Sequence, residues 1–124
     1  MDRDNVSDIS ALVDDRVAEG VFRIDRSLYL DEEIYRREME VIFEKGWVFL
    51  CHESQVPAAG DYFATFIGRQ PVFVNRRDDG TLGCFINACS HRGALLTPFQ
   101  RGNPKVFTCR FHGWVFDGAG RCSR

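Results

Sequence analysis

Two short loops near the end of the sequence each pair one cysteine with one histidine, and this pattern constrains the fold most. The first loop reads Cys89-Ser90-His91, and the second, after a spacer of seventeen residues, reads Cys109-Arg110-Phe111-His112. Each loop offers one sulfur and one nitrogen ligand within three or four residues, so it can bind a metal centre from one side. If the two loops lie side by side, they can bind one metal centre together.

Two kinds of metal centre use such ligands. Two sulfurs on one iron and two imidazoles on a second iron are the ligand set of a Rieske [2Fe–2S] cluster. The alternative is a tetrahedral zinc site with two Cys and two His, which would only stabilise the fold. Zinc loops usually pair Cys with Cys and His with His, whereas each loop here mixes the two types. The pattern favours the iron–sulfur cluster and leaves zinc as an open alternative.

The composition is that of one ordinary globular domain. Of the 124 residues, 44% are hydrophobic and 27% are charged, and the formal net charge is −2. Nucleic-acid binders normally carry a basic stripe, so we expect no nucleic-acid partner. No run of eighteen apolar residues and no signal peptide are present, which predicts no membrane partner and a cytoplasmic protein. The odd number of cysteines, five, favours metal ligands or buried thiols over disulfides in that reducing compartment.

Helical patterns precede strand patterns along the chain. Apolar residues recur on one face from Val6 to Val17, which predicts a helix. A second helix is predicted over Asp31–Lys45, with Asp31 as its N-cap and Gly46 just past its end. We therefore expect an N-terminal helical segment over residues 1–46.

From residue 47 onward the hydrophobic period changes to two, as in strands. Asp79-Gly80 is a hairpin signal, and short strands are predicted at 47–52, 62–68, 71–77, 81–87, 106–109 and 114–117. This spacing predicts a mostly β, antiparallel sandwich over residues 47–124, with cluster-binding loops at 87–93 and 107–114. The sequence stops at GRCSR where a further strand is expected, which predicts truncation at the C-terminal edge.

The sequence around both loops resembles one protein family. The large (alpha) subunits of bacterial aromatic-ring-hydroxylating dioxygenases have cluster loops similar to CSHRGALL and CRFHGWVF. The benzoate, toluate, anthranilate and halobenzoate dioxygenase group in particular resembles FRIDRSLYLDEEIYRREMEVIFEKGWVFLCHESQVP, IGRQPVFVNR and INACSHRGA. The resemblance covers nearly the whole chain beyond Val17 and implies a Rieske-type β-sandwich with N-terminal helices.

The resemblance assigns roles to residues of both loops. Cys89 and Cys109 would bind the inner iron, and His91 and His112 the outer iron through one ring nitrogen each. Neighbouring residues would support the cluster and tune its potential through hydrogen bonds to the sulfides; they are Arg92, Gly93, Gly113 and Trp114. On a plainer interpretation, Trp114 is a core residue and Arg92 a surface charge.

One position departs from the family pattern, and the remaining cysteines and histidine lie outside the predicted ligands. A proline is usual in the family where this chain has Arg110, and we expect the cluster to survive with a small effect on its potential. Cys51 and Cys84 are predicted to be buried thiols. Cys122 also lies outside the ligand pattern, and His52 is predicted to be a structural histidine.

High-potential respiratory Rieske centres resemble C-T-H-L-G-C with C-P-C-H-G-S. Their two extra cysteines form a disulfide between the loops, and their serine hydroxyl donates a hydrogen bond to a sulfide. This chain has Ala94 and Phe111 in place of those cysteines and Trp114 in place of that serine. With fewer donors, the potential is expected near the bottom of the Rieske range, about −150 mV.

The resemblance also implies an activity for the whole protein. Electrons from NADH would pass through a flavin and [2Fe–2S] reductase, or a ferredoxin, and through the Rieske cluster to a mononuclear non-haem Fe(II). There O2 would cis-dihydroxylate an aromatic carboxylate such as benzoate, as a step of aromatic hydrocarbon catabolism. Family members assemble as trimers of alpha subunits, usually with a small beta subunit.

The catalytic residues are not expected in this chain. A mononuclear iron of this kind needs two histidines and a carboxylate, and His52 is the one histidine left outside the loops. The catalytic domain is therefore expected to be absent. A stand-alone Rieske ferredoxin is the alternative function, and a zinc-binding scaffold is a third. The predicted helix at Asp31–Lys45 and the HRGA and HGW phrases, which are rare in ferredoxins, favour the dioxygenase subunit.

Overall fold

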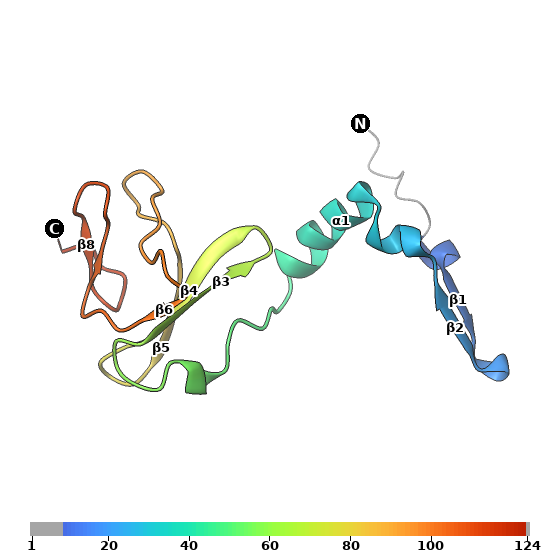
Figure 1. Cartoon of the computed structure of the whole chain (residues 1–124), viewed down its shortest axis with the longest axis horizontal. Helices are drawn as coiled ribbons and strands as arrows, with labels where there is room; N and C mark the ends of the chain where they lie inside the picture. The colour runs from blue at the N-terminus through green and yellow to red at the C-terminus, as the bar shows by residue number, and fades with distance from the viewer. Residues whose placement is uncertain (1–8, 124) are drawn as a thin grey trace. The chain divides into compact units, whose positions relative to one another are not determined.

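The computed structural model describes residues 9–123 and divides the chain into two compact units, Met1–Trp47 and Val48–Arg124. Most of the strands of both units are labelled in Figure 1. None of the helices in the described residues is long and apolar enough to cross a membrane.

In the described part of the first unit, a small hairpin stands in place of the helix predicted over Val6–Val17. Strands β1 (Val13–Arg16) and β2 (Val21–Ile24) pair antiparallel, and short 3₁₀ turns flank β1 at Ile9–Leu12 and Val17–Glu19. Gly20 reverses the chain with φ 65°, a left-handed conformation that glycine adopts without strain. Pairing between the strands satisfies the backbone groups that a helix would have bonded internally. The helix prediction is therefore wrong for residues 9–17, and residues 6–8 lie outside the described part.

The second predicted helix is present. A 3₁₀ turn at Arg26–Tyr29 leads into α1 (Glu32–Glu38), which continues as a π-helical turn over Met39–Phe43. Asp31 Oδ1 accepts hydrogen bonds from the N–H groups of Glu33 and Ile34, at 2.8 and 3.1 Å. At the other end, the Gly46 N–H donates to the Ile42 carbonyl at 2.9 Å. The sequence thus located both ends of this helical stretch.

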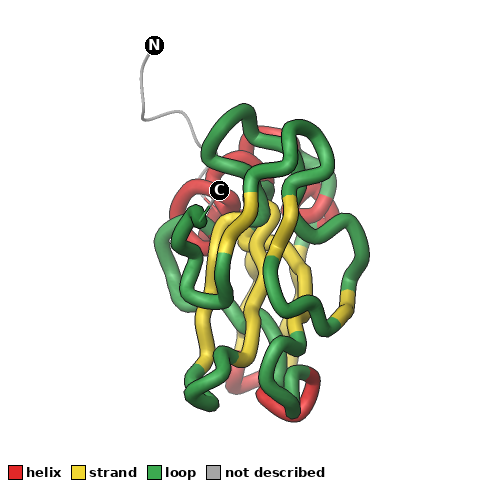
Figure 2. The backbone as a smooth tube through the Cα atoms, turned by 90° about the vertical axis from the view of Figure 1, so that its left-hand side faces the viewer, coloured by secondary structure: helices red, strands yellow, loops and turns green. Residues whose placement is uncertain are grey.

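The second unit is built on a four-stranded antiparallel sheet, ordered β5-β4-β3-β6. Its strands are β3 (Tyr62–Ile67), β4 (Gln70–Arg76), β5 (Leu82–Ile86) and β6 (Arg101–Gly102), and a separate hairpin holds β7 (Phe107–Thr108) and β8 (Val115–Phe116). Figure 2 shows the strands side by side with loops at both ends. The mostly β, antiparallel architecture is confirmed. The segment 47–52, predicted to be a strand, has no strand partner in the described chain and leads into a 3₁₀ turn at Glu53–Gln55.

The β4–β5 hairpin turns where Asp79-Gly80 predicts. The Gly80 N–H donates to the Arg77 carbonyl at 2.9 Å, and Gly80 has φ 81°. Asp79 Oδ1 accepts from both the N–H and the hydroxyl of Thr81, at 2.9 and 2.6 Å. This turn sets the register in which Arg76 lies opposite Leu82.

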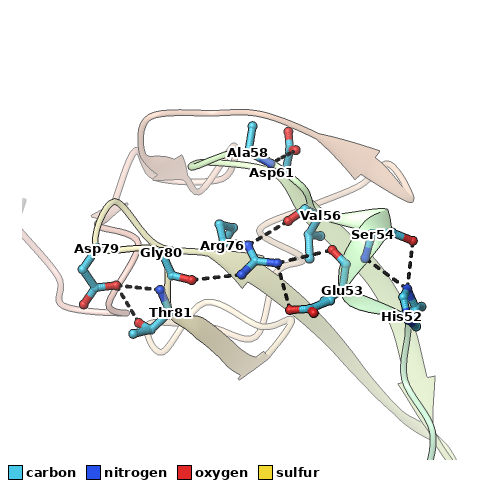
Figure 3. Close-up of polar contacts among 10 residues, drawn as sticks. All are labelled: His52, Glu53, Ser54, Val56, Ala58, Asp61, Arg76, Asp79, Gly80 and Thr81. Carbon is cyan, nitrogen blue, oxygen red and sulfur yellow. Dashed lines mark hydrogen bonds and ion pairs between the residues drawn. The ribbon is translucent and has the colours of Figure 1, made fainter.

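Arg76 then ties this hairpin to the segment that precedes the sheet (Figure 3). Its guanidinium donates to the carbonyl oxygens of Val56, Gly80 and Glu53, at 2.9, 2.9 and 3.3 Å. The Arg76 side chain is only 17% exposed, so these hydrogen bonds replace the water that the charged guanidinium has lost. Sequence reasoning did not single out this residue, because an arginine at a strand end carries no signal of its carbonyl partners.

The core of the second unit lies between one face of the sheet and the β7–β8 hairpin. Tyr62 and Phe73 from the sheet pack against Phe107 from β7, with ring centroids 5.9 and 4.7 Å from that of Phe107. The same buried cluster contains Phe116 of β8 and the two loop cysteines, Cys89 and Cys109. Burial of these rings therefore fixes the bases of both loops against the sheet.

Candidate metal centre

The two cysteine–histidine loops have the same backbone hydrogen bonds. In the first, the Cys89 N–H donates to the Ala94 carbonyl at 2.8 Å, and the Gly93 N–H donates to the Cys89 carbonyl at 2.8 Å. In the second, Cys109 donates to Trp114 at 2.8 Å, and Gly113 donates to Cys109 at 3.0 Å. Each cysteine is therefore bonded to the residues four and five positions after it. We call this pattern the loop frame.

A glycine in a left-handed conformation completes each frame. Gly93 has φ 74° and Gly113 has φ 75°. A Cβ added to either glycine would meet no atom within 4 Å, so space is not what requires glycine here. The positive φ is the reason, because side chains with a Cβ adopt it at a cost.

The frames direct sulfur inward and imidazole outward. Cys89 and Cys109 are 3% and 2% exposed and belong to the core, whereas His91 and His112 are exposed. Both loops rise side by side from the same end of the second unit (Figure 1). The four predicted ligands thus form a buried sulfur pair and an exposed nitrogen pair.

The buried sulfurs are in contact with each other and with backbone donors. The N–H of Phe111, then that of His112, and a hydrogen bond with the Cys89 thiol lower the pKa of the Cys109 thiol, against desolvation, which raises it. Metals bind the thiolate form of cysteine, so this environment favours metal binding at Cys109.

Aromatic rings surround the two histidines. The His91 and His112 ring centroids are 4.7 Å apart, with an interplanar angle of 70°. Trp114 stacks on His91 at 4.8 Å and 13°, and Phe111 contacts His112 at 4.0 Å and 34°. Trp114 is half-buried and also packs on the core. Trp114 is therefore part of the core, as one of the two sequence interpretations expected, and it also contacts the predicted ligand His91.

The two arginines near the ligands are both exposed and lie over aromatic rings. The Arg92 guanidinium carbon is 5.9 Å from the centroid of Phe111, and that of Arg110 is 5.6 Å from the centroid of Phe99. Arg110 thus places its charge over a ring outside the loop frames. Cation–π contacts of this length are attractive at exposed sites.

Asn87, which sequence reasoning did not single out, closes the base of the first loop. The side chain is 4% exposed, and its Nδ2 donates to the Thr97 carbonyl at 3.0 Å. Its Oδ1 accepts from the N–H groups of Leu96 and Thr97, at 3.1 and 2.9 Å. A polar residue between an apolar strand and the first ligand was the available signal.

The remaining cysteines and histidine lie outside the loops. Burial raises the pKa of the half-buried Cys51 thiol and also that of Cys84, although Cys84 is exposed by surface area. The prediction that Cys84 is buried is therefore wrong, because β5 is at the edge of the sheet. Cys122 is also exposed. His52 Nδ1 accepts from the Ser54 N–H at 3.2 Å and caps the 3₁₀ turn, which agrees with a structural role (Figure 3).

The donor set fits a cluster with two irons. The donors form two pairs, with the buried sulfurs at one end and the exposed imidazoles at the other. A Rieske cluster has this division of ligands between its two irons.

The profile of the Rieske [2Fe-2S] domain family matches residues 46–124, more than half of the chain. The chain belongs to this family. It therefore contains a Rieske domain, and the predicted cofactor class, a [2Fe–2S] cluster, is confirmed at the level of the family.

The relatives of this Rieske domain confirm the predicted resemblance. The chain is 47% identical to the toluate 1,2-dioxygenase alpha subunit of Pseudomonas putida and 45% identical to the anthranilate 1,2-dioxygenase large subunit of Acinetobacter baylyi, in each case over 91% of this chain. It spans about a quarter of their lengths, 25% and 24%. Naphthalene 1,2-dioxygenase from Rhodococcus sp. has a similar fold, with a TM-score of 0.77 and 35% identity over 82% of this chain and 23% of that one.

Proposed function

We propose that Cys89 and Cys109 bind one iron of the Rieske cluster and that His91 and His112 bind the other. The observation that carries this assignment is the shared loop frame, which buries both thiols in the core and leaves both imidazoles exposed. The Phe111 and His112 N–H groups that stabilise the Cys109 thiolate support it further.

When bound, such a cluster takes up and releases single electrons. The residues of this chain determine where the electrons enter and leave. Burial of the cysteines excludes water from the sulfur end, and exposure of the histidines puts the nitrogen end within reach of a redox partner. The second unit is thus suited to electron entry.

We further propose that the whole protein is the alpha subunit of an aromatic-ring-hydroxylating dioxygenase. It would receive NADH-derived electrons from a flavin and [2Fe–2S] reductase or a ferredoxin, and act on an aromatic carboxylate such as benzoate. Toluate and anthranilate dioxygenase subunits among the relatives support this substrate class. Assembly with other alpha subunits and a small beta subunit, in the cytoplasm, is part of the same proposal.

Metal analysis tests the cluster assignment. The 124-residue chain, produced with iron–sulfur assembly intact, should be red-brown and contain equal amounts of iron and acid-labile sulfide, two of each per chain. Colourless protein with one zinc per chain would contradict it.

The dioxygenase assignment has a separate test. The gene should continue past Arg124 into a domain with two histidines and a carboxylate for a mononuclear iron. An enzyme made from the complete gene should consume O2 and convert benzoate to a cis-dihydrodiol in the presence of its reductase and NADH. A complete gene that ends at the Rieske domain would instead support the ferredoxin alternative.

A further inference from the structure

The aromatic contacts around the histidines cross between the loops in both directions. Trp114 of the second loop lies flat on His91 of the first, with centroids 4.8 Å apart and planes at 13°. In return, Arg92 of the first loop lies over Phe111 of the second, at 5.9 Å. Phe111 contacts His112 at 4.0 Å. Besides the contact between the two histidine rings themselves, each loop therefore supports the histidine of the other, directly at His91 and through Phe111 at His112.

We propose that these two contacts form an interloop clamp that positions both histidines for the outer iron. The clamp consists of Trp114 on His91 and Arg92 on Phe111, and it rests on the ligand assignment made under the proposed function. Its members would be positioning residues that act through the histidines.

The loops need such a connection because their frames are internal. The frame bonds of Cys89 with Gly93 and Ala94, and those of Cys109 with Gly113 and Trp114, close each loop on itself. The buried core cluster that contains both Cys89 and Cys109 connects the loops at the buried end. At the exposed end, side-chain contacts hold one loop against the other. The clamp consists of such contacts.

The Trp114 half of the clamp is anchored in the core. Trp114 packs against the core cluster and also stacks on His91, so the core holds the ring on which the imidazole lies. Phe111 is 59% exposed, and Arg92 is exposed too, so the cation–π contact gives this ring a partner at the surface. Phe111 and Ala94 occupy the two positions where the respiratory type has its interloop disulfide. The clamp would thus be a noncovalent counterpart of that bridge.

A double-mutant cycle on the iron-loaded 124-residue chain tests the clamp. The rate of cluster loss is followed by the decay of visible absorbance in excess chelator. Arg92→Gln and Phe111→Leu should each speed the loss by about two- to fivefold, because each removes one exposed cation–π contact. The double variant should be no faster than the faster single variant. Arg101→Gln is the matched control: it removes the Arg101–Phe63 contact of 5.0 Å, which lies within the sheet, and should leave the rate unchanged.

The stacking half is tested with a conservative rescue. Trp114→Leu should speed cluster loss by about two- to tenfold, and Trp114→Phe should restore most of the difference. Phe111→Tyr should likewise behave as the unchanged chain. The g-values of the reduced cluster and its midpoint potential report the geometry of the outer iron's ligands. They should shift in Phe111→Leu and Trp114→Leu and return in the two aromatic variants.

The outcomes separate the clamp from the ligand assignment. Independent, multiplicative effects of Arg92→Gln and Phe111→Leu would overturn the clamp, as would an Arg101→Gln effect of equal size or unchanged g-values in both leucine variants. In those cases a wild-type chain that holds its cluster still supports the proposed function. Failure of the wild-type chain to bind a [2Fe–2S] cluster would overturn both.

Discussion

The two ligand loops share one backbone frame, yet the rest of the fold supports them differently. At the base of the first loop, one buried amide, Asn87, bonds three backbone groups of Leu96 and Thr97. At the base of the second, the β7–β8 hairpin pairs Phe107 with Phe116 and carries the loop as its turn. The same geometry therefore depends on a single side chain in one loop and on strand pairing in the other.

The comparison also shows which spacing the frame requires. His91 follows its cysteine by two residues and His112 follows its cysteine by three, but in both loops the glycine follows by four. The frame therefore depends on the distance from cysteine to glycine. The histidines leave the frame at different positions, and their rings meet at 70°.

Loss of either histidine should have the largest effect and should be the same in both loops. His91→Ala and His112→Ala each remove one proposed ligand of the outer iron, so both variants should lack the visible spectrum of the cluster and contain no stoichiometric iron and sulfide. Cys84→Ser, which lies outside the loop frames, should keep the visible spectrum and the full iron and sulfide content. A cluster retained in full by one histidine variant would show that the loops are not equivalent.

Asn87→Ala should destabilise the first loop more than the second. Removing the amide leaves buried N–H and carbonyl groups without partners, which should cost on the order of 3 kcal/mol in the free energy of unfolding. Hydrogen-exchange mass spectrometry should show faster exchange in peptides covering Cys89–Thr97 than in those covering Phe107–Phe116. Asn103→Ala is the control, since this exposed amide bonds Ala59 and Asp61 and water can replace it. Equal acceleration in both loops would contradict separate supports.

The two frame glycines should respond alike to substitution. Gly93→Ala and Gly113→Ala each force a side chain into a left-handed conformation, at about 1–2 kcal/mol, with no clash in either loop. Urea unfolding of both variants measures the cost. Gly118→Ala, at a glycine without positive φ, should cost less. Costs at Gly93 and Gly113 that differ severalfold would break the equivalence of the frames.

Arg110→Gln should have the smallest effect. The arginine is exposed and lies over Phe99, so solvent and salt screen its charge from the cluster. Removing a positive charge disfavours the reduced, more negative cluster, and the midpoint potential should fall by on the order of 10 mV from a value of about −150 mV. An anaerobic redox titration of the wild-type chain and of the variant measures the midpoint potential and its shift. A wild-type potential above zero would contradict the low-potential centre.

The sequence predicted those parts of the fold that depend on local chemistry. Alternation with a hairpin signal located β3, β4 and β5, and Asp31 and Gly46 marked the ends of the helical stretch. The helix predicted over Val6–Val17 failed, because its apolar spacing does not reveal that Gly20 turns the chain back on itself.

At the site, the Cys and His spacing brought the four predicted ligands together, and their metal-binding roles stay a prediction. What the sequence did not give is the set of long-range contacts. Asn87 bonding Thr97, Arg76 bonding Val56, and Arg92 over Phe111 depend on how separate segments pack. No spacing within one loop encodes such pairs.

The division of ligands between a sulfur end and a nitrogen end is most directly tested by pulsed electron paramagnetic resonance of the reduced cluster. Protein labelled with ¹⁵N at histidine should show two strongly coupled histidine nitrogens, one from His91 and one from His112. A reduced cluster with no coupled histidine nitrogen, or with a single one, would contradict the assignment.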